Sequence, residues 1–225
     1  MKRTIEMILD SLVSLTVPVI LSVLSILLLL SPLFTNLEYR RPGFPEDRYG
    51  FTLEDRLEYG NLTRRYLVSR QPLEVLRELK FDSGDPLYLE RELSHLYDVK
   101  IVLKGVMRVF LVAVAVILLI GIYSWKNERF SAYLRAIARG GRLTAILLVA
   151  ILFLTLISFQ ALFTNFHLIF FEGDSWLFSY SDTLIRLFPM RFWQDIFLVF
   201  GVLTLVGGGY LGWFMPVGRT EDEGG

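Results

Sequence analysis

The chain lacks cysteine altogether and has only two histidines, His95 and His167, among its 225 residues. The absence of cysteine excludes disulfides, thiolate metal ligands and a cysteine nucleophile. An excess of either charge is also absent: 23 basic residues balance 23 acidic ones, so no strongly basic surface favours binding to nucleic acid. Histidine is the side chain whose unperturbed pKa lies close to neutral pH. If proton transfer at that pH depends on such a group, His95 and His167 are the only candidates.

Several familiar catalytic motifs are missing as well. The sequence contains no G-x-S-x-G turn, no H-E-x-x-H helix and no G-x-x-x-x-G-K-[ST] loop. The familiar serine-hydrolase layout, the zinc-protease helix and the phosphate-cradling loop therefore receive no support.

Long hydrophobic runs are abundant. Hydrophobic residues make up 53% of the chain, and the mean hydropathy is +0.49. A helix needs about 20 apolar residues to cross the hydrocarbon core of a bilayer. The sequence therefore predicts an all-α membrane protein with a single membrane domain, residues 1–218, and a disordered cytoplasmic tail, residues 219–225. The four predicted spans are residues 12–34, 101–125, 143–163 and 196–217.

The loop between the second and third spans predicts the orientation. Residues 126–142 contain five basic residues and one acidic residue. Because basic residues near span ends stay in the cytoplasm, both termini are predicted to lie inside. Residues 36–98, with ten basic and thirteen acidic residues, and residues 164–195 then lie outside.

The first outer segment contains helical patterns of leucine among charges. A chain break at residues 81–86 ends with Asp85 and Pro86, a pair that suits a helix start. From Leu87 the helical pattern runs on into the second span. We therefore predict one long helix whose outer part stands above the membrane.

The second outer segment is rich in aromatic residues, with ten between Phe163 and Trp193. This density predicts an interfacial loop folded into the outer headgroup layer. Polar groups in so apolar a setting need partners or a polar cavity, and they include His167, Glu172, Asp174 and Arg186.

The two histidines are predicted to share one site. His95 precedes the second span and His167 follows the third, so an antiparallel pair of spans brings both to the same outer level. Carboxylates accompany each of them in the sequence: Glu92 and Asp98 lie around His95, and Glu172 and Asp174 follow His167. A carboxylate beside an imidazole fixes its tautomer and raises its basicity, as a general base requires.

A stripe of cations follows His95 at four-residue spacing. Lys100 and Lys104 are expected to extend toward the interface. Arg108 lies about two turns into the span, and an intramembrane cation is expected to face the helix bundle and to mark a functional site.

Two separated segments resemble one known family. Residues 89–100, LERELSHLYDVK, are similar to the E-x-x-H-x-x-D-V-K stretch of the lipoprotein intramolecular transacylase family of Gram-positive bacteria. Residues 162–189 resemble its second signature, approximately L-F-x-x-F-H…F-F…W…D-x-L-I-x-x-F-P. The order of the elements agrees, and the resemblance covers nearly the whole chain except for residues 36–85.

The resemblance implies a reaction on diacylglyceryl-modified bacterial lipoproteins at the outer face of the bacterial cytoplasmic membrane. An O-acyl chain would leave the glyceryl sn-2 position and join the α-amino group of the N-terminal cysteine, which gives a lyso-form lipoprotein. His95 and His167 correspond to the essential histidines of the family, and no cofactor is expected. Further candidates for contact with the substrate or the oxyanion are Lys104, Arg108, Trp176 and Arg186.

Two other classes of function remain open. One is a metal-dependent membrane hydrolase, in which both histidines with Glu92 or Glu172 supply three ligands. The other is a non-enzymatic accessory or sensor protein whose segment 36–98 binds a partner. In the fourth span, Gly208 and Gly212 form a G-x-x-x-G frame, which predicts close helix packing within the bundle or between copies.

Overall fold

The structure is a computed structural model, and it describes residues 2–216 apart from the side chains of residues 154–156. Within that range the chain is helical and forms no β-strand, with one isolated bridge between Lys80 and Pro86. This confirms the predicted all-α class. The chain divides into two compact units. Unit 1 contains Met1–Ser25, Met107–Phe153 and the chain from Phe200 on, and unit 2 contains Ile26–Val106 and Leu154–Val199.

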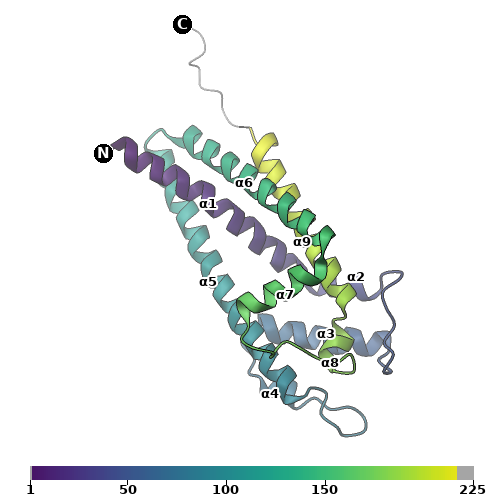
Figure 1. The fold of residues 1–225 in the computed structure, drawn as a ribbon. Coiled ribbons are helices and arrows are strands. Elements are labelled where there is room, and N and C mark those ends of the chain that lie inside the picture. The colour runs from purple at the N-terminus through teal and green to yellow at the C-terminus, as the bar shows by residue number, and fades with distance from the viewer. Residues whose placement is uncertain (1, 217–225) are drawn as a thin grey trace. The chain divides into compact units, whose positions relative to one another are not determined.

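Four helices of the described residues are long and apolar enough to cross a membrane, as the sequence predicts. They are α1 (Lys2–Leu29), α5 (Glu90–Lys126), α6 (Phe130–Ile157) and α9 (Met190–Gly209), which continues as the short π-helix η1 (Tyr210–Phe214) (Figure 1). The predicted tail, residues 219–225, lies outside the described residues.

The first span ends earlier than predicted. α1 ends at Leu29, and a second helix, α2 (Pro32–Tyr39), begins after two residues. Ser31 is extended, as the residue before a proline tends to be, and its hydroxyl accepts a hydrogen bond from the Phe34 N–H. Pro32 occupies the first turn of α2, where its missing N–H costs nothing. The apolar run therefore continues through two separate helices.

The third apolar run is also divided between two helices. α6 ends at Ile157, and α7 (Phe159–Phe170) follows directly. Ser158 between them is extended and accepts a hydrogen bond from the Ala161 N–H, which caps the start of α7. Part of the predicted span 143–163 thus belongs to a separate helix of 12 residues, which is too short to cross a membrane.

Glycines bring the helices of unit 1 into close contact. A Cβ atom added at Gly140 of α6 would lie 2.7 Å from the carbonyl oxygen of Ser14 on α1. At the next residue, Gly141, it would lie 2.7 Å from the Gly208 carbonyl oxygen and from the Gly212 nitrogen. The G-x-x-x-G frame of the fourth span therefore packs against α6 of the same chain, which answers a question that the sequence left open.

We expect Gly141→Ala to destabilise the protein even though alanine favours helices. The better helix propensity contributes about 1 kcal/mol, whereas overpacking a filled contact costs about 1–3 kcal/mol. Gly209→Ala is the matched control, since nothing lies within 4 Å of the added Cβ at that position. Thermal unfolding of both variants in detergent should give a lower midpoint for Gly141→Ala alone. Equal midpoints would contradict the packing argument.

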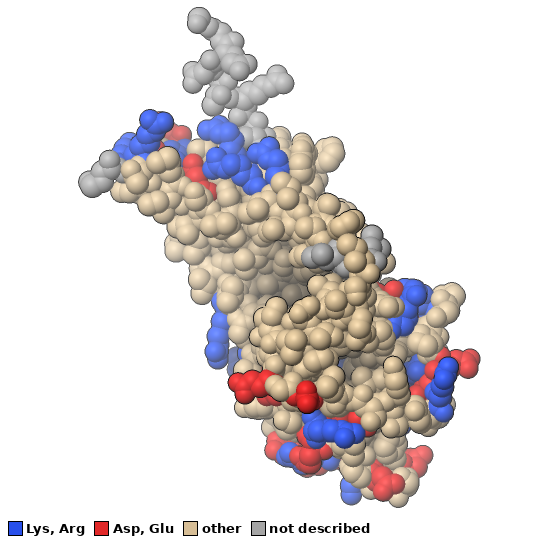
Figure 2. Space-filling view, in the orientation of Figure 1, with Lys and Arg blue, Asp and Glu red and all other residues tan. Residues whose placement is uncertain are grey.

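Charged residues of unit 1 concentrate at the end where α1 and α6 begin (Figure 2). Arg129 pairs with Glu6 at 3.6 Å and with Asp10 at 3.4 Å, and Arg139 lies 3.8 Å from Asp10. Only residues 127–129 of the predicted loop 126–142 lie between helices, because α6 begins at Phe130, and Arg129 and Arg139 tie this segment to the first helix.

Unit 2 has its own hydrophobic core. Its helices, besides α2 and α7, are α3 (Leu53–Val68), α4 (Glu74–Arg77) and α8 (Thr183–Leu187), with the N-terminal parts of α5 and α9. α8 follows α7 through residues 171–182, so helices occupy part of the segment that the sequence predicts to be an interfacial loop (Figure 1). The buried core residues are Tyr66, Leu76, Leu87, Tyr88, Leu93, Leu96, Leu184 and Leu187.

α5 confirms the long helix predicted from the sequence, since it runs unbroken for 37 residues. Its predicted start at Asp85 and Pro86 is wrong. These residues belong to a tight turn in which the Phe81 N–H donates to the Asp85 carbonyl and Gly84 has a φ of +88°. Pro86 pairs with Lys80 across this turn, and the helix begins at Glu90.

Candidate active site

The two histidines lie side by side in unit 2. His95 is in the second turn of α5, and His167 is in the last turn of α7. Their ring centroids are 6.1 Å apart, and their planes are 20° from parallel. Both side chains are buried, with 8% and 7% of their surface exposed. The structure therefore brings together the two residues that the sequence predicts to share a site.

Aromatic rings enclose both imidazoles. Phe171 contacts both, with centroid distances of 4.7 Å to His95 and 5.5 Å to His167. Phe178 lies 5.4 Å from His95, and Trp176 lies 4.8 Å from His167. Trp176, a candidate for contact with the substrate, thus lies against His167. An apolar surround excludes water and strengthens electrostatic interactions inside it.

His167 has a defined tautomer. Its Nδ1 lies 2.8 Å from the carbonyl oxygen of Phe163, one helical turn earlier. A carbonyl only accepts, so Nδ1 carries the hydrogen and Nε2 keeps a free lone pair. Burial lowers the pKa of His167, partly offset by the hydrogen bond to Phe163. The imidazole is therefore neutral near pH 7, as a general base must be.

His95 differs from His167: its Nδ1 is buried and has no hydrogen-bond partner among the described residues. The sequence predicts that Glu92 or Asp98 orients this ring, and the structure shows no hydrogen bond from either carboxylate to it among the described residues. Asp98 is half-buried and forms no hydrogen bond or ion pair with any described residue. The carboxylate of Glu92 instead accepts the N–H groups of Leu89 and Leu184, at 2.8 and 2.7 Å.

The carboxylates predicted to support His167 also lie elsewhere. Glu172 and Asp174 are exposed, and their side chains form no hydrogen bond or ion pair within the described part of the chain. The reason is the end of α7: Phe171 leaves the helix in an extended conformation, which turns the following residues toward the surface. A backbone carbonyl takes the orienting role expected of a carboxylate.

Three cations differ from their predicted places. Lys100 is buried, with Nζ 2.6 Å from the Gln71 carbonyl oxygen and 3.8 Å from the centre of the Tyr66 ring. Lys104 is exposed, and nine residues at about 100° each place it about 180° around α5 from His95. Lys104 is therefore not a contact of the histidine site.

Arg108 is exposed too, so the expectation that it faces the helix bundle is wrong. The buried stripe of α5 in unit 1 passes through Ala113, Ile120 and Ser124. Five residues separate Arg108 from Ala113, or about 140° around the helix, which turns the guanidinium away from the protein interior. Within the described residues it forms no hydrogen bond or ion pair.

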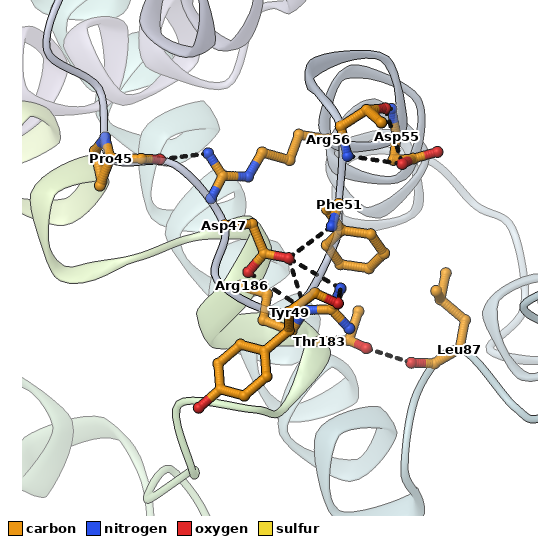
Figure 3. A network of polar contacts seen from close by, with 10 residues as sticks. Pro45, Asp47, Tyr49, Phe51, Asp55, Arg56, Leu87, Thr183 and Arg186 are labelled. Atoms are coloured by element: carbon orange, nitrogen blue, oxygen red, sulfur yellow. Dashed lines mark hydrogen bonds and ion pairs between the residues drawn. The ribbon is translucent and has the colours of Figure 1, made fainter.

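Arg186 is not free to bind a substrate group either. Its guanidinium donates to the Asp47 carboxylate, at 3.0 Å for the shortest contact, and lies 3.6 Å from the centre of the Phe51 ring (Figure 3). The exposed fractions of the two charged side chains are 10% and 3%. Arg186 thus joins α8 to residues 41–51 as a structural ion pair.

Sequence reasoning did not single out Phe171 and Phe178, which contact His95 directly. A signal for the first was present in the spacing. Phe163, His167 and Phe171 recur every four residues, which places them along one side of a helix. No local pattern marks Phe178, because it reaches His95 through the fold of residues 171–182.

The fold and the site define a class: an all-helical membrane protein with a pair of buried, aromatic-enclosed histidines. Comparison with known proteins agrees. The sequence profile of the family "Lipoprotein intramolecular transacylase Lit" matches residues 9–193. An uncharacterized protein of Aquifex aeolicus (strain VF5) is 31% identical over 182 residues, which are 78% of this chain and 81% of that one. The chain belongs to the lipoprotein intramolecular transacylase family, and it is an enzyme of that class.

Solved structures show the same fold. The in meso structure of the membrane-integral lipoprotein intramolecular transacylase Lit from Bacillus cereus has a TM-score of 0.77 at 20% identity, over 92% of this chain and 93% of that one. The same protein with one histidine replaced by arginine gives a TM-score of 0.71 at 19% identity, over 93% and 90% of the two chains.

Proposed function

We propose that the protein transfers an O-acyl chain within a bacterial lipoprotein, from the glyceryl sn-2 position to the α-amino group of the N-terminal cysteine. The product is a lyso-form lipoprotein, and His95 and His167 are the catalytic residues. The observation that carries the proposal is the pair of buried imidazoles, 6.1 Å apart, in a chain that has no other histidine and no cysteine.

His167 is assigned as the general base. Its Nε2 has the free lone pair, because Nδ1 donates to the Phe163 carbonyl. Nε2 accepts a proton as the amine nitrogen of the substrate attacks the sn-2 ester carbonyl and the new N–C bond forms. The amine must be neutral to attack, so an ammonium loses one proton beforehand.

His95 is assigned to the leaving group. As the C–O bond of the ester breaks, the proton taken up by His167 passes to the glyceryl oxygen by way of His95, whose imidazole gains a proton at one nitrogen as it releases one from the other. Starting from the neutral amine, the transfer consumes and releases no proton overall, and the ammonium form releases one proton to water beforehand. General acid–base catalysis of this kind contributes about 10²–10⁴-fold to a rate.

The substrate supplies the nucleophile, so the enzyme needs neither a cysteine nor an activated serine. Holding the amine against the ester makes the attack intramolecular, and good alignment lowers a barrier by about 7–11 kcal/mol in favourable cases. In this proposal, the aromatic residues around the site hold the acyl chains and exclude water, which would otherwise hydrolyse the ester.

The site is assigned to the extracytoplasmic face of a bacterial cytoplasmic membrane. The support is the excess of basic residues in segment 126–142, around the short loop 127–129, since basic residues near span ends stay in the cytoplasm. The histidines lie at the opposite ends of α5 and α6 from this loop, near the start of α5 and beyond the end of α6.

The alternative of a metal-dependent hydrolase receives less support from the donor set. It requires a third ligand beside the histidines, and Glu92 is bonded to two backbone N–H groups while Glu172 is exposed. Within the described residues, no three His, Asp or Glu side chains are grouped as metal ligands. Metal analysis of the purified protein tests this alternative directly.

The proposal is tested by expressing the chain in a bacterium that lacks the activity and analysing a lipoprotein's N-terminal peptide by mass spectrometry. The expected product is an N-acyl, S-monoacylglyceryl cysteine whose total acyl content is unchanged. A diacyl peptide with a free amine, found while the chain is present in the membrane, would overturn the proposal. A peptide with three acyl chains would overturn the intramolecular route, because the third chain must come from another lipid.

A further inference from the structure

Glu92 is the most deeply buried carboxylate of unit 2, with 1% of its surface exposed. It forms no ion pair with any described residue. Its two oxygens accept separate backbone hydrogen bonds, from the Leu89 N–H at 2.8 Å and from the Leu184 N–H at 2.7 Å. A buried carboxylate without these donors would be costly, so Glu92 depends on both contacts.

The two donors belong to different parts of the chain. Leu89 precedes the first residue of α5, and Glu92 is the third residue of that helix, so this bond is the glutamate half of a capping box. Leu184 is the second residue of α8, 92 residues further along the chain. One carboxylate therefore holds the starts of two helices together.

Two more contacts join the same two helix starts, and a third fixes the residues before α8. The Thr183 hydroxyl donates to the Leu87 carbonyl at 2.5 Å (Figure 3), and Arg91 donates to the Asp182 carboxylate at 2.7 Å. Asp182 also accepts the Ser179 N–H at 2.9 Å, which fixes the residues just before α8. Glu92 is the buried member of this set.

These contacts hold both sides of the histidine site. Glu92 lies one helical turn before His95, so it fixes the part of α5 that carries this imidazole. The segment that ends at α8 carries Phe178, which contacts His95, and Trp176, which contacts His167. The two rings are held on a segment whose position relative to α5 depends on Glu92.

We propose that Glu92 is a positioning residue: it fixes His95 relative to the segment 171–182 that encloses both imidazoles, and it does so without a hydrogen bond to either ring among the described residues. This role of Glu92 rests on the proposed function only for the measurement of acyl transfer, and not for the measurement of imidazole positions. It replaces the idea, drawn from the sequence, that Glu92 orients His95 by direct contact. The competing explanation is that the negative charge of Glu92 alters the properties of His95. A substitution that removes another of these hydrogen bonds without changing any charge separates this explanation from positioning.

Three variants make the test. Glu92→Gln replaces one accepting oxygen with an NH₂ donor. The glutamine side chain can then accept the N–H group of Leu89 or of Leu184 in this arrangement, but not both. Thr183→Val removes the parallel bond to Leu87 and changes no charge. Glu90→Gln is the matched control: Glu90 lies on the same helical turn, but its side chain is exposed and pairs only with Arg77 at the surface.

Two readouts are measured on folded protein in detergent. The first is the imidazole NMR signals of protein with isotopically labelled histidine. Because the chain has two histidines, replacing either one by alanine assigns both signals. The second is kcat and KM for acyl transfer to the lipoprotein amine. A misplacement of about 1 Å can cost about a hundredfold in rate, so we expect a ten- to hundredfold loss in kcat with little change in KM.

The proposal predicts that Glu92→Gln and Thr183→Val both move the imidazole signals and lower kcat, whereas Glu90→Gln does neither. If Glu92→Gln does not fold, Thr183→Val against Glu90→Gln carries the same test. The proposal is overturned if Glu92→Gln leaves signals and kcat unchanged, or if Thr183→Val moves nothing while Glu92→Gln shifts the titration of His95. Should the unchanged chain give no N-acyl product, the proposed function fails, and the NMR signals still decide the role of Glu92.

Discussion

Replacing His167 by alanine is expected to lower the rate of lyso-form lipoprotein formation by about 10²–10⁴-fold, the range that general base catalysis provides. The reason is specific to one atom. Nε2 of His167 holds the free lone pair because Nδ1 donates to the Phe163 carbonyl. The chain has no cysteine and no third histidine that could replace His167. The measurement is the rate at which the N-acyl peptide appears in membranes that contain equal amounts of each variant.

A second substitution separates catalysis from folding. His167→Asn places an NH₂ donor near the position of Nδ1, so the bond to the Phe163 carbonyl is retained while Nε2 is lost. We expect this variant to keep the thermal stability of the parent protein and to lose the activity. Asn165→Ala is the control, since Asn165 is an exposed residue of α7 that bonds only within its own helix, to the Ala161 carbonyl. If His167→Asn retained full activity, His167 would not be the base.

Asp47→Ala is expected to destabilise unit 2 by about 3–5 kcal/mol, because it leaves the nearly buried guanidinium of Arg186 without its counter-charge. Arg186 also packs on the Phe51 ring, so it cannot turn to solvent without losing that contact (Figure 3). Denaturant unfolding of the purified protein measures the change. The matched control is Glu90→Ala in the exposed pair with Arg77, which is expected to leave the unfolding midpoint close to that of the parent protein because solvent screens the pair.

The double variant Asp47→Ala with Arg186→Met tests the cause. Removing both charges should cost less than removing Asp47 alone, since no unpaired charge remains buried. A double variant that is less stable than Asp47→Ala would contradict the argument and would point to packing around Phe51 instead.

The same ion pair predicts a dependence on pH. Burial alone would raise the pKa of Asp47, but hydrogen bonds from Arg186 and from the Phe51 N–H, with the charge of Arg186, hold it below the usual 3.8. The folded state therefore binds this proton less readily than the unfolded state. The stabilisation is fully present above about pH 4 and is lost as the pH falls through the lowered pKa, and Asp47→Ala should lack this acid-dependent component.

The sequence by itself determined the elements whose causes are local. Apolar runs of sufficient length required four spanning helices, and the uninterrupted helical pattern required the helix of the second span to begin well before its apolar part. The antiparallel order of the second and third spans was enough to place His95 and His167 at one level. In the structure the centroids of the two imidazole rings are 6.1 Å apart, in agreement with that prediction.

Only the tertiary structure decided which partner each polar side chain has. Helical periodicity assigns a residue to a face but does not say what that face meets, so the carboxylates close to the histidines in the sequence were natural but incorrect choices. A backbone carbonyl orients His167, Glu92 joins a helix 92 residues away, and Arg186 pairs with Asp47, 139 residues earlier in the chain. In an apolar surround every buried polar group must find some partner, and the fold alone brings those partners within reach.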